Sequence, residues 1–109
     1  MRVRWLRKAL LNLAGEAEYI AREDPVAAGH TVARISEAVE RLVTFPALGR
    51  PGRVVGTREL VVSGTPYILP YRVHGNDVEI LRVFHAARKW PARFRRWFAG
   101  SKVGFSRRF

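Results

Sequence analysis

The first half of the chain contains two stretches in which apolar residues recur at the spacing of a helix face. Apolar side chains return every three or four positions over residues 6–20 and again over residues 28–42. This spacing is typical of amphipathic helices that turn one face toward an interior. Between the stretches, Asp24-Pro25 combines a helix-capping residue with a proline that is tolerated in a first helical turn. The pattern therefore predicts two antiparallel helices, the first ending near Asp24 and the second near Val43.

The second half changes to short segments that have the character of strands. Residues 57–62, 67–73 and 78–85 are rich in Val, Ile, Leu and Tyr, and connections containing glycine separate them. They predict three strands of an antiparallel meander. Residues 2–5 alternate between apolar and polar side chains and predict a short first strand. Glycine and proline exclude regular structure from residues 48–56.

The order of these elements indicates an α+β fold, in which the helical hairpin packs on a three- to four-stranded antiparallel sheet. Pro70 conflicts with its predicted strand because a proline removes a ladder donor, and we expect it at a sheet edge or a bulge. Aromatic residues at positions 94, 97 and 98 follow Pro91 at helical spacing and predict a short C-terminal helix. We expect one domain over residues 1–100 and a flexible basic tail over residues 101–109.

Charge is distributed unevenly along the chain. The 109 residues include 20 basic and 9 acidic side chains, which give a formal charge of +11, and no acid occurs after Glu79. Such asymmetry indicates an acidic partner, either a nucleic acid or a negatively charged protein. The alternative is a charged tail that only keeps the protein in solution.

Other composition features exclude several classes of function. The chain has no cysteine, so disulfides and thiolate metal sites are excluded. Its three histidines, His30, His74 and His85, are too far apart for a short metal-binding motif. We expect neither a metal nor a cofactor. The N-terminal apolar stretch is interrupted by Asn12 and is too short for export or for crossing a bilayer, so we expect a cytoplasmic protein without membrane contact.

Several of these features together resemble the RelE/ParE family of small bacterial toxins. The resemblance covers residues 3–91 and rests on the turn Phe-Pro-Ala-Leu-Gly-Arg-Pro-Gly-Arg at 45–53, the three strands after it, and the ending His-x-x-Arg-x-Trp at 85–90. It implies one of two activities. Members of the RelE branch cut messenger RNA within the ribosome, whereas members of the ParE branch bind DNA gyrase and trap it on cleaved DNA without performing chemistry.

The residues that a ribonuclease would need are present only in part. RNA cleavage requires a base, an acid and groups that hold the phosphate. The candidates are Arg58, Glu59, Arg72, Arg82 and His85. Alignment on Tyr71 places Ile68 where the ribonucleases carry an arginine, and no tyrosine follows His85. We therefore expect a gyrase inhibitor that is not an enzyme, with a ribosome-dependent endonuclease as the alternative. A plain nucleic-acid-binding domain is a third interpretation, but the chain has no recognised binding motif.

The resemblance also implies partners. A cognate acidic antitoxin is expected to wrap over the hairpin and sheet in a hetero-oligomer, with contacts at Leu10, Leu13, Ile35, Val39, Leu42 and Tyr71. Contacts to the target, gyrase or ribosome, are expected at Arg50, Arg53, Arg82, His85, Arg88, Arg93 and Trp97. Some of these residues also have a structural interpretation. Arg72 and Arg82 could form ion pairs with Glu59 or Glu79, and His85 could bond to the backbone.

Overall fold

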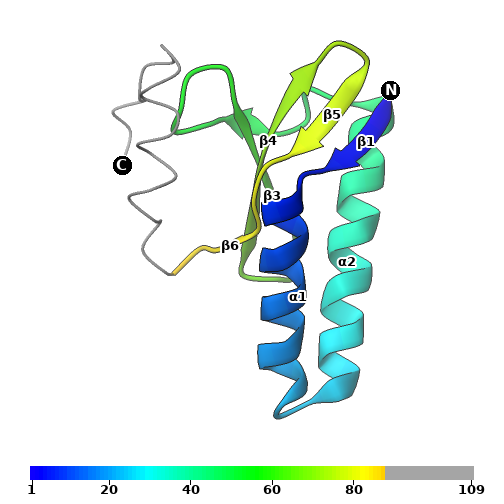
Figure 1. Ribbon diagram of the computed structural model, residues 1–109, viewed down its shortest axis with the longest axis vertical. Coiled ribbons are helices and arrows are strands. Elements are labelled where there is room, and N and C mark those ends of the chain that lie inside the picture. The colour runs from blue at the N-terminus through cyan, green and yellow to red at the C-terminus, as the bar shows by residue number, and fades with distance from the viewer. Residues whose placement is uncertain (88–109) are drawn as a thin grey trace.

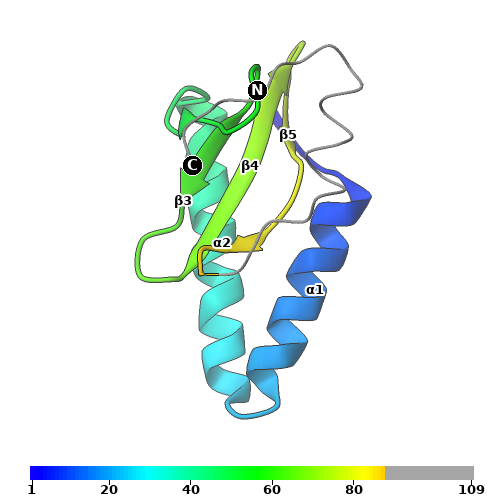
Figure 2. The same ribbon diagram turned by 90° about the vertical axis from the view of Figure 1, so that its left-hand side faces the viewer.

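Two helices lie together against one face of a single sheet (Figures 1 and 2). The computed structural model describes residues 1–87, so the predicted C-terminal helix and flexible tail lie outside the described residues. The elements are β1 (Arg2–Trp5), α1 (Arg7–Ala21), α2 (Pro25–Thr44), β2 (Arg50–Pro51), β3 (Arg58–Val61), β4 (Tyr67–His74), β5 (Asp77–Ile80) and β6 (Phe84–His85). This arrangement confirms the predicted α+β class.

The helical hairpin forms where the apolar spacing predicts it. The Asp24 carboxylate accepts a hydrogen bond of 3.0 Å from the Ala27 backbone N–H, and Pro25 occupies the first turn of α2. A capping residue of this kind stabilises a helix by about 1 kcal/mol relative to alanine. The connection between α1 and α2 lies at the end of the hairpin that projects beyond the sheet (Figure 1).

The sheet has the strand order β1-β5-β4-β3-β2, and β6 also pairs with β4. The predicted antiparallel meander is confirmed for β3, β4 and β5. β1, however, pairs with β5 in parallel, so the sheet is mixed and not wholly antiparallel. Residues 50 and 51, which we predicted to be irregular, form the short strand β2 beside β3.

The last predicted strand, residues 78–85, is divided into β5 and β6. Tyr71 lies opposite Ile80 and Ile68 lies opposite Phe84, so two residues of β4 face three residues of the other strand. This is the arrangement of a β-bulge. At this point the Leu81 N–H donates to the carbonyl of Pro70 at 2.9 Å. Both backbone groups of a strand residue point to the same side, so the nitrogen of Pro70 faces the bulge. The expected bulge is therefore present, although Pro70 lies in a central strand.

The main core lies between the hairpin and the sheet. Its fully buried residues include Ile35 and Leu42 from α2 and Leu69, Tyr71 and Ile80 from the strands. A smaller cluster joins Val54, Ile68, Leu81 and Phe84, with Leu6 packed against it. Alternation along β4 places Ile68 on the opposite face from Leu69. The sheet is thus covered by the helices on one face and presents different side chains on the other, which we call the outer face.

Candidate functional site

Charged side chains form rows across the strands on the outer face. In β1, Val3 and Trp5 pack against the core, so Arg2 and Arg4 point to the other side. Arg2 lies opposite Asp77, and its Nε is 3.1 Å from that carboxylate. The rows are therefore built by cross-strand pairing, which brings together residues far apart in the sequence.

The carboxylate of Glu79 is held between two arginines. Only 5% of its side chain is exposed, and its oxygens lie 2.7 Å from Arg72 Nε and 3.7 Å from Arg4 Nη1. The register explains the contact, because Arg4, Glu79 and Arg72 lie opposite one another on three neighbouring strands. The predicted ion pair between Arg72 and Glu79 is confirmed. Arg4 was not predicted, although alternation within residues 2–5 places it on this face.

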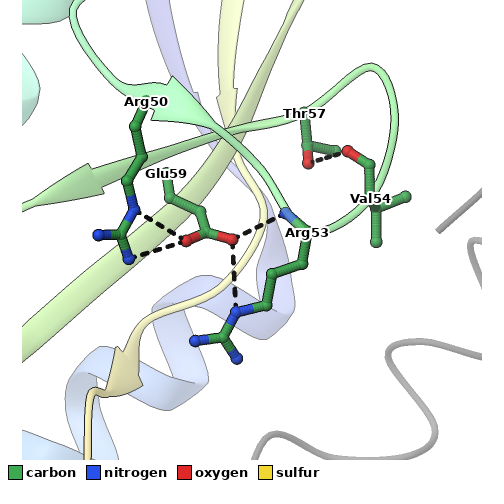
Figure 3. Close-up of polar contacts among 5 residues, drawn as sticks. All are labelled: Arg50, Arg53, Val54, Thr57 and Glu59. Carbon is green, nitrogen blue, oxygen red and sulfur yellow. Dashed lines mark hydrogen bonds and ion pairs between the residues drawn. The ribbon is translucent and has the colours of Figure 1, made fainter. Parts of the chain in front are cut away.

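Glu59 has a similar environment nearer the other edge of the sheet (Figure 3). Its Oε1 accepts hydrogen bonds from Nη2 and Nε of Arg50 at 3.1 and 3.3 Å. Its Oε2 accepts a 2.9 Å bond from the Arg53 backbone N–H and lies 3.7 Å from Arg53 Nε. The Glu59 side chain is 3% exposed. One buried carboxylate therefore fixes both arginines of the turn, and charge-assisted bonds of this kind are stronger than neutral ones.

The backbone of this turn is fixed by tight packing as well. The Gly52 N–H donates to the Thr57 carbonyl at 2.9 Å. The Thr57 hydroxyl donates to the Val54 carbonyl at 2.6 Å (Figure 3). A β-carbon at Gly52 would collide with Oγ1 of Thr57. The turn thus requires glycine at position 52 and presents its two arginines from a rigid backbone.

Tyr71 ties the start of the same turn to the core. Its hydroxyl accepts a 2.8 Å bond from the Gly49 N–H and donates a 2.7 Å bond to the Pro46 carbonyl. Burial raises the pKa of Tyr71 above its ordinary value of 10.0, although the Gly49 bond and the Arg58 guanidinium act in the opposite direction. The neutral hydroxyl is the form that can make both bonds.

The structure does not bring the five ribonuclease candidates together. Arg58 shares a face with Tyr71, opposite to Glu59, and donates to the Gly49 carbonyl at 2.7 Å. Glu59 and Arg72 are engaged in the ion pairs described above.

The remaining two candidates lie near β6. The guanidinium carbon of Arg82 is 5.9 Å from the ring centroid of Phe84. Nδ1 of His85 accepts a 3.2 Å bond from the Ala87 N–H, and its ring stands edge-on to Tyr67. The backbone contact predicted for His85 is confirmed. Glu59 forms its ion pairs with Arg50 and Arg53, and Glu79 forms its ion pairs with Arg4 and Arg72. The predicted pairing of Arg82 with one of these two acids is not among them.

Most of the predicted antitoxin contacts are core residues, which corrects the sequence interpretation. Ile35, Val39, Leu42 and Tyr71 are at most 2% exposed. The reason is that the apolar stripe of α2 faces the sheet of its own chain and is not free for a partner. Leu13 is partly buried against the core, and only Leu10 is exposed. Leu11 and Tyr19 on α1 are also exposed, and they were not predicted because they lie off the apolar stripe of this helix.

The predicted target contacts are distributed between described and undescribed parts of the chain. Arg50 and Arg53 lie in the rigid turn, with 53% and 24% of their side chains exposed. Arg88, Arg93 and Trp97 lie outside the described residues. Within residues 1–87, no helix has the length and apolar character to cross a membrane.

Comparison with known proteins gives the family. Residues 3–90 match the family described as the ParE toxin of the type II toxin-antitoxin system parDE. The chain belongs to the ParE toxin family. It is 52% identical over 90 residues to Y4kP of Sinorhizobium fredii, which is named as a candidate toxin. This match covers 83% of this chain and 93% of that protein. It is 37% identical over 84 residues to the toxin RelE2 of Caulobacter vibrioides, covering 77% and 93% of the two chains.

A solved ParE-like structure has the same fold. The match is to a chain of the chromosomal ParDE toxin-antitoxin system from P. aeruginosa, with 34% identity and a TM-score of 0.70. It covers 78% of this chain and 95% of the other. The resemblance predicted from the turn and the strands is thus confirmed at the level of the RelE/ParE family.

Proposed function

We propose that this protein is the toxin of a type II toxin-antitoxin pair and arrests growth by binding DNA gyrase. A cognate antitoxin neutralises it by forming a hetero-oligomer. The protein performs no chemistry on its target. Support for the toxin role comes from the family match and from the likeness to a chain of the ParDE system.

The observation that carries the choice of a binding mechanism is the state of the two buried carboxylates. A general acid or base must be able to exchange a proton with the substrate at hydrogen-bond distance. Glu59 and Glu79 are 3% and 4% exposed, and each lies between two arginines. Their oxygens already accept hydrogen bonds from Arg50, Arg72 and the Arg53 backbone N–H, and burial leaves little of either carboxylate within reach of a substrate. Both groups are therefore suited to holding arginines in place.

The Arg50–Arg53 turn forms a rigid, cationic surface, which suits a protein that acts by binding. The Arg50–Arg53 turn projects from β2 and is fixed to the sheet through Glu59, so its guanidinium groups are presented with little loss of conformational freedom on binding. This geometry supports our proposal that Arg50 and Arg53 contact the target. Contacts at Arg82, His85 and, beyond the described residues, Arg88, Arg93 and Trp97 complete the proposed surface.

Expression in cells without the antitoxin tests this function. We expect cleaved chromosomal DNA bound to gyrase and a DNA-damage response. Messenger RNA should not be cut while transcription continues. A gyrase variant that resists the toxin should restore growth. Growth arrest with intact DNA would contradict the proposal.

The alternative is a ribosome-dependent endonuclease, and the name of the RelE2 relative is the observation that favours it. In that case ribosome-bound messenger RNA would be cut at defined codons. Replacing a positioned acid or base typically lowers the rate by roughly a hundredfold to ten-thousandfold. Cuts that disappear in His85→Ala would therefore establish the endonuclease.

A further inference from the structure

The outer edge of β3 is only partly covered by another strand. β2 pairs with Arg58 and Glu59 and then ends, so Val61 lies beyond its reach. The Val62 N–H donates to the Tyr67 carbonyl of β4. Because backbone groups of successive strand residues point to opposite sides, the N–H and C=O of Val61 face the outer edge. Within residues 1–87 these two groups have no hydrogen-bond partner, and the Val61 side chain is 50% exposed.

An open groove of about 330 Å³ runs along this edge, between β3 and the C-terminal part of α2. Its lining includes Arg41 from α2, Arg50 from β2, and the apolar side chains of Leu48 and Val61. Ser63 also lines the groove, and its backbone carbonyl accepts a 3.4 Å bond from Arg34. The groove therefore combines unpaired backbone groups with apolar and cationic side chains.

The positive charges in the groove are not balanced by its own acid. Glu59 lines the groove, but its carboxylate is already shared by Arg50 and Arg53. Arg41 is exposed, and no ion pair joins it to an acid within residues 1–87. An occupant that brings carboxylates would gain charge-assisted bonds here.

We propose that the edge of β3 at Val61 receives an extended acidic peptide segment of a partner chain, which adds as a short strand in line with β2. Unpaired edge groups are a template for strand addition, with main-chain bonds giving affinity and alternate side chains giving specificity. Carboxylates of the segment lie near Arg34, Arg41 and Arg50, and an apolar residue between them contacts Leu48 and Val61. The source of the segment is the antitoxin, and for that source alone this inference rests on the proposed function.

Charge argues against a second copy of the same chain as the occupant. Pairing two copies through β3 would bring the same arginines of both chains together, and like charges placed opposite each other disfavour association. An acidic segment meets the opposite sign on both sides of the added strand.

Hydrogen exchange at the Val61 amide tests the strand addition directly. In the free protein this amide is expected to exchange rapidly, whereas the Leu60 amide, which faces β4, exchanges slowly. In the complex with the purified antitoxin, exchange at Val61 should slow by at least tenfold. A complex in which the Val61 amide exchanges as fast as in the free protein overturns the proposal.

Two matched pairs of variants test the backbone and the charge separately. Val61→Pro removes the outward N–H without removing a bond to β4, whereas Val61→Ala keeps the N–H. Loss of one hydrogen bond corresponds to roughly a two- to tenfold weaker Kd, which we expect for the proline variant only. Arg41→Gln is compared with Arg22→Gln, since both arginines are exposed at the C-terminal end of a helix. Only Arg41→Gln should weaken binding, by roughly two- to fivefold.

The remaining outcomes are also decisive. If Val61→Pro does not fold, the exchange measurement on the wild type and the Arg41 variant still decide the question. If no antitoxin complex forms, the proposed function fails. The groove is then tested by measuring hydrogen exchange at Val61 with two capped peptides, one that alternates Val and Glu and one that alternates Val and Lys. Saturable protection of Val61 by the acidic peptide alone supports the groove, and protection by neither overturns it. Protection that appears at high protein concentration together with dimers in light scattering identifies a second copy as the occupant and also overturns it.

Discussion

Replacing Glu59 by glutamine removes the charge that holds the Arg50–Arg53 turn while keeping the size and shape of the side chain. In the wild type, the two carboxylate oxygens accept three hydrogen bonds from this turn. The glutamine oxygen can still accept from Arg50. Its NH₂ group must then face the Arg53 N–H, where a donor meets a donor. We therefore expect lower stability and a loosened turn.

The size of the loss follows from the exposure of each partner. A hydrogen bond to a charged group contributes about 1.5–3 kcal/mol. Because 53% of the Arg50 side chain is exposed, its ion pair is screened and adds little. The bond from the Arg53 N–H to the buried oxygen dominates, so the free energy of unfolding should fall by about 2 kcal/mol, within the range for bonds to charged groups. For a small domain this corresponds to a Tm lower by roughly 10 °C.

Urea unfolding of purified protein measures this change, and Asp77→Asn is the control. That substitution also removes one carboxylate charge, but its partner Arg2 is 78% exposed, so the loss should stay below about 1 kcal/mol. Loosening of the turn should also lower the affinity for gyrase in Glu59→Gln. If Glu59→Gln and Asp77→Asn have equal unfolding free energies, the buried carboxylate does not organise the turn.

Three further substitutions test the packing around the same turn. Gly52→Ala should lower the unfolding free energy by about 1–3 kcal/mol because its new methyl group meets Thr57. Gly15→Ala, which has open space around it inside α1, should raise the unfolding free energy by about 0.5–1 kcal/mol. Equal effects of the two substitutions in thermal unfolding would refute the packing argument. Tyr71→Phe leaves the buried Gly49 N–H without its acceptor and should cost about 1–3 kcal/mol in the same measurement. Because the pKa of Tyr71 is raised in the folded protein, the folded state favours the neutral hydroxyl. Wild-type stability is therefore full below about pH 10 and falls as the pH rises from there through the folded pKa. Tyr71→Phe should show a smaller loss of stability at alkaline pH, and an unchanged loss would show that another group is responsible.

The helices could be predicted from the sequence because their signals are local. The stripe of apolar residues and the Asp24-Pro25 pair each lie within a few positions of the structure they specify. The alternation in the second half gave the meander for the same reason, since each strand is joined to the next by a short connection.

The features that were missed depend on contacts between distant residues. Nothing within residues 2–5 indicates that β1 joins β5 in parallel, so the position of Arg4 beside Glu79 could not be anticipated. The division of the last strand depends on the bulge opposite Pro70, which is visible only after the strands are paired. The antitoxin residues were misassigned because an apolar helix stripe has the same pattern whether it covers its own sheet or binds a partner.

The most direct test of the central claim is a reconstituted assay with purified toxin, gyrase, DNA and ATP, run beside a translation reaction containing messenger RNA. A binding inhibitor acts in proportion to its amount, so we predict cleaved DNA held by gyrase that reaches its maximum near one toxin per gyrase binding site, with full-length messenger RNA throughout. The account would be contradicted if wild-type toxin, at a concentration far below that of the ribosomes, degraded messenger RNA over many turnovers while gyrase continued to supercoil DNA.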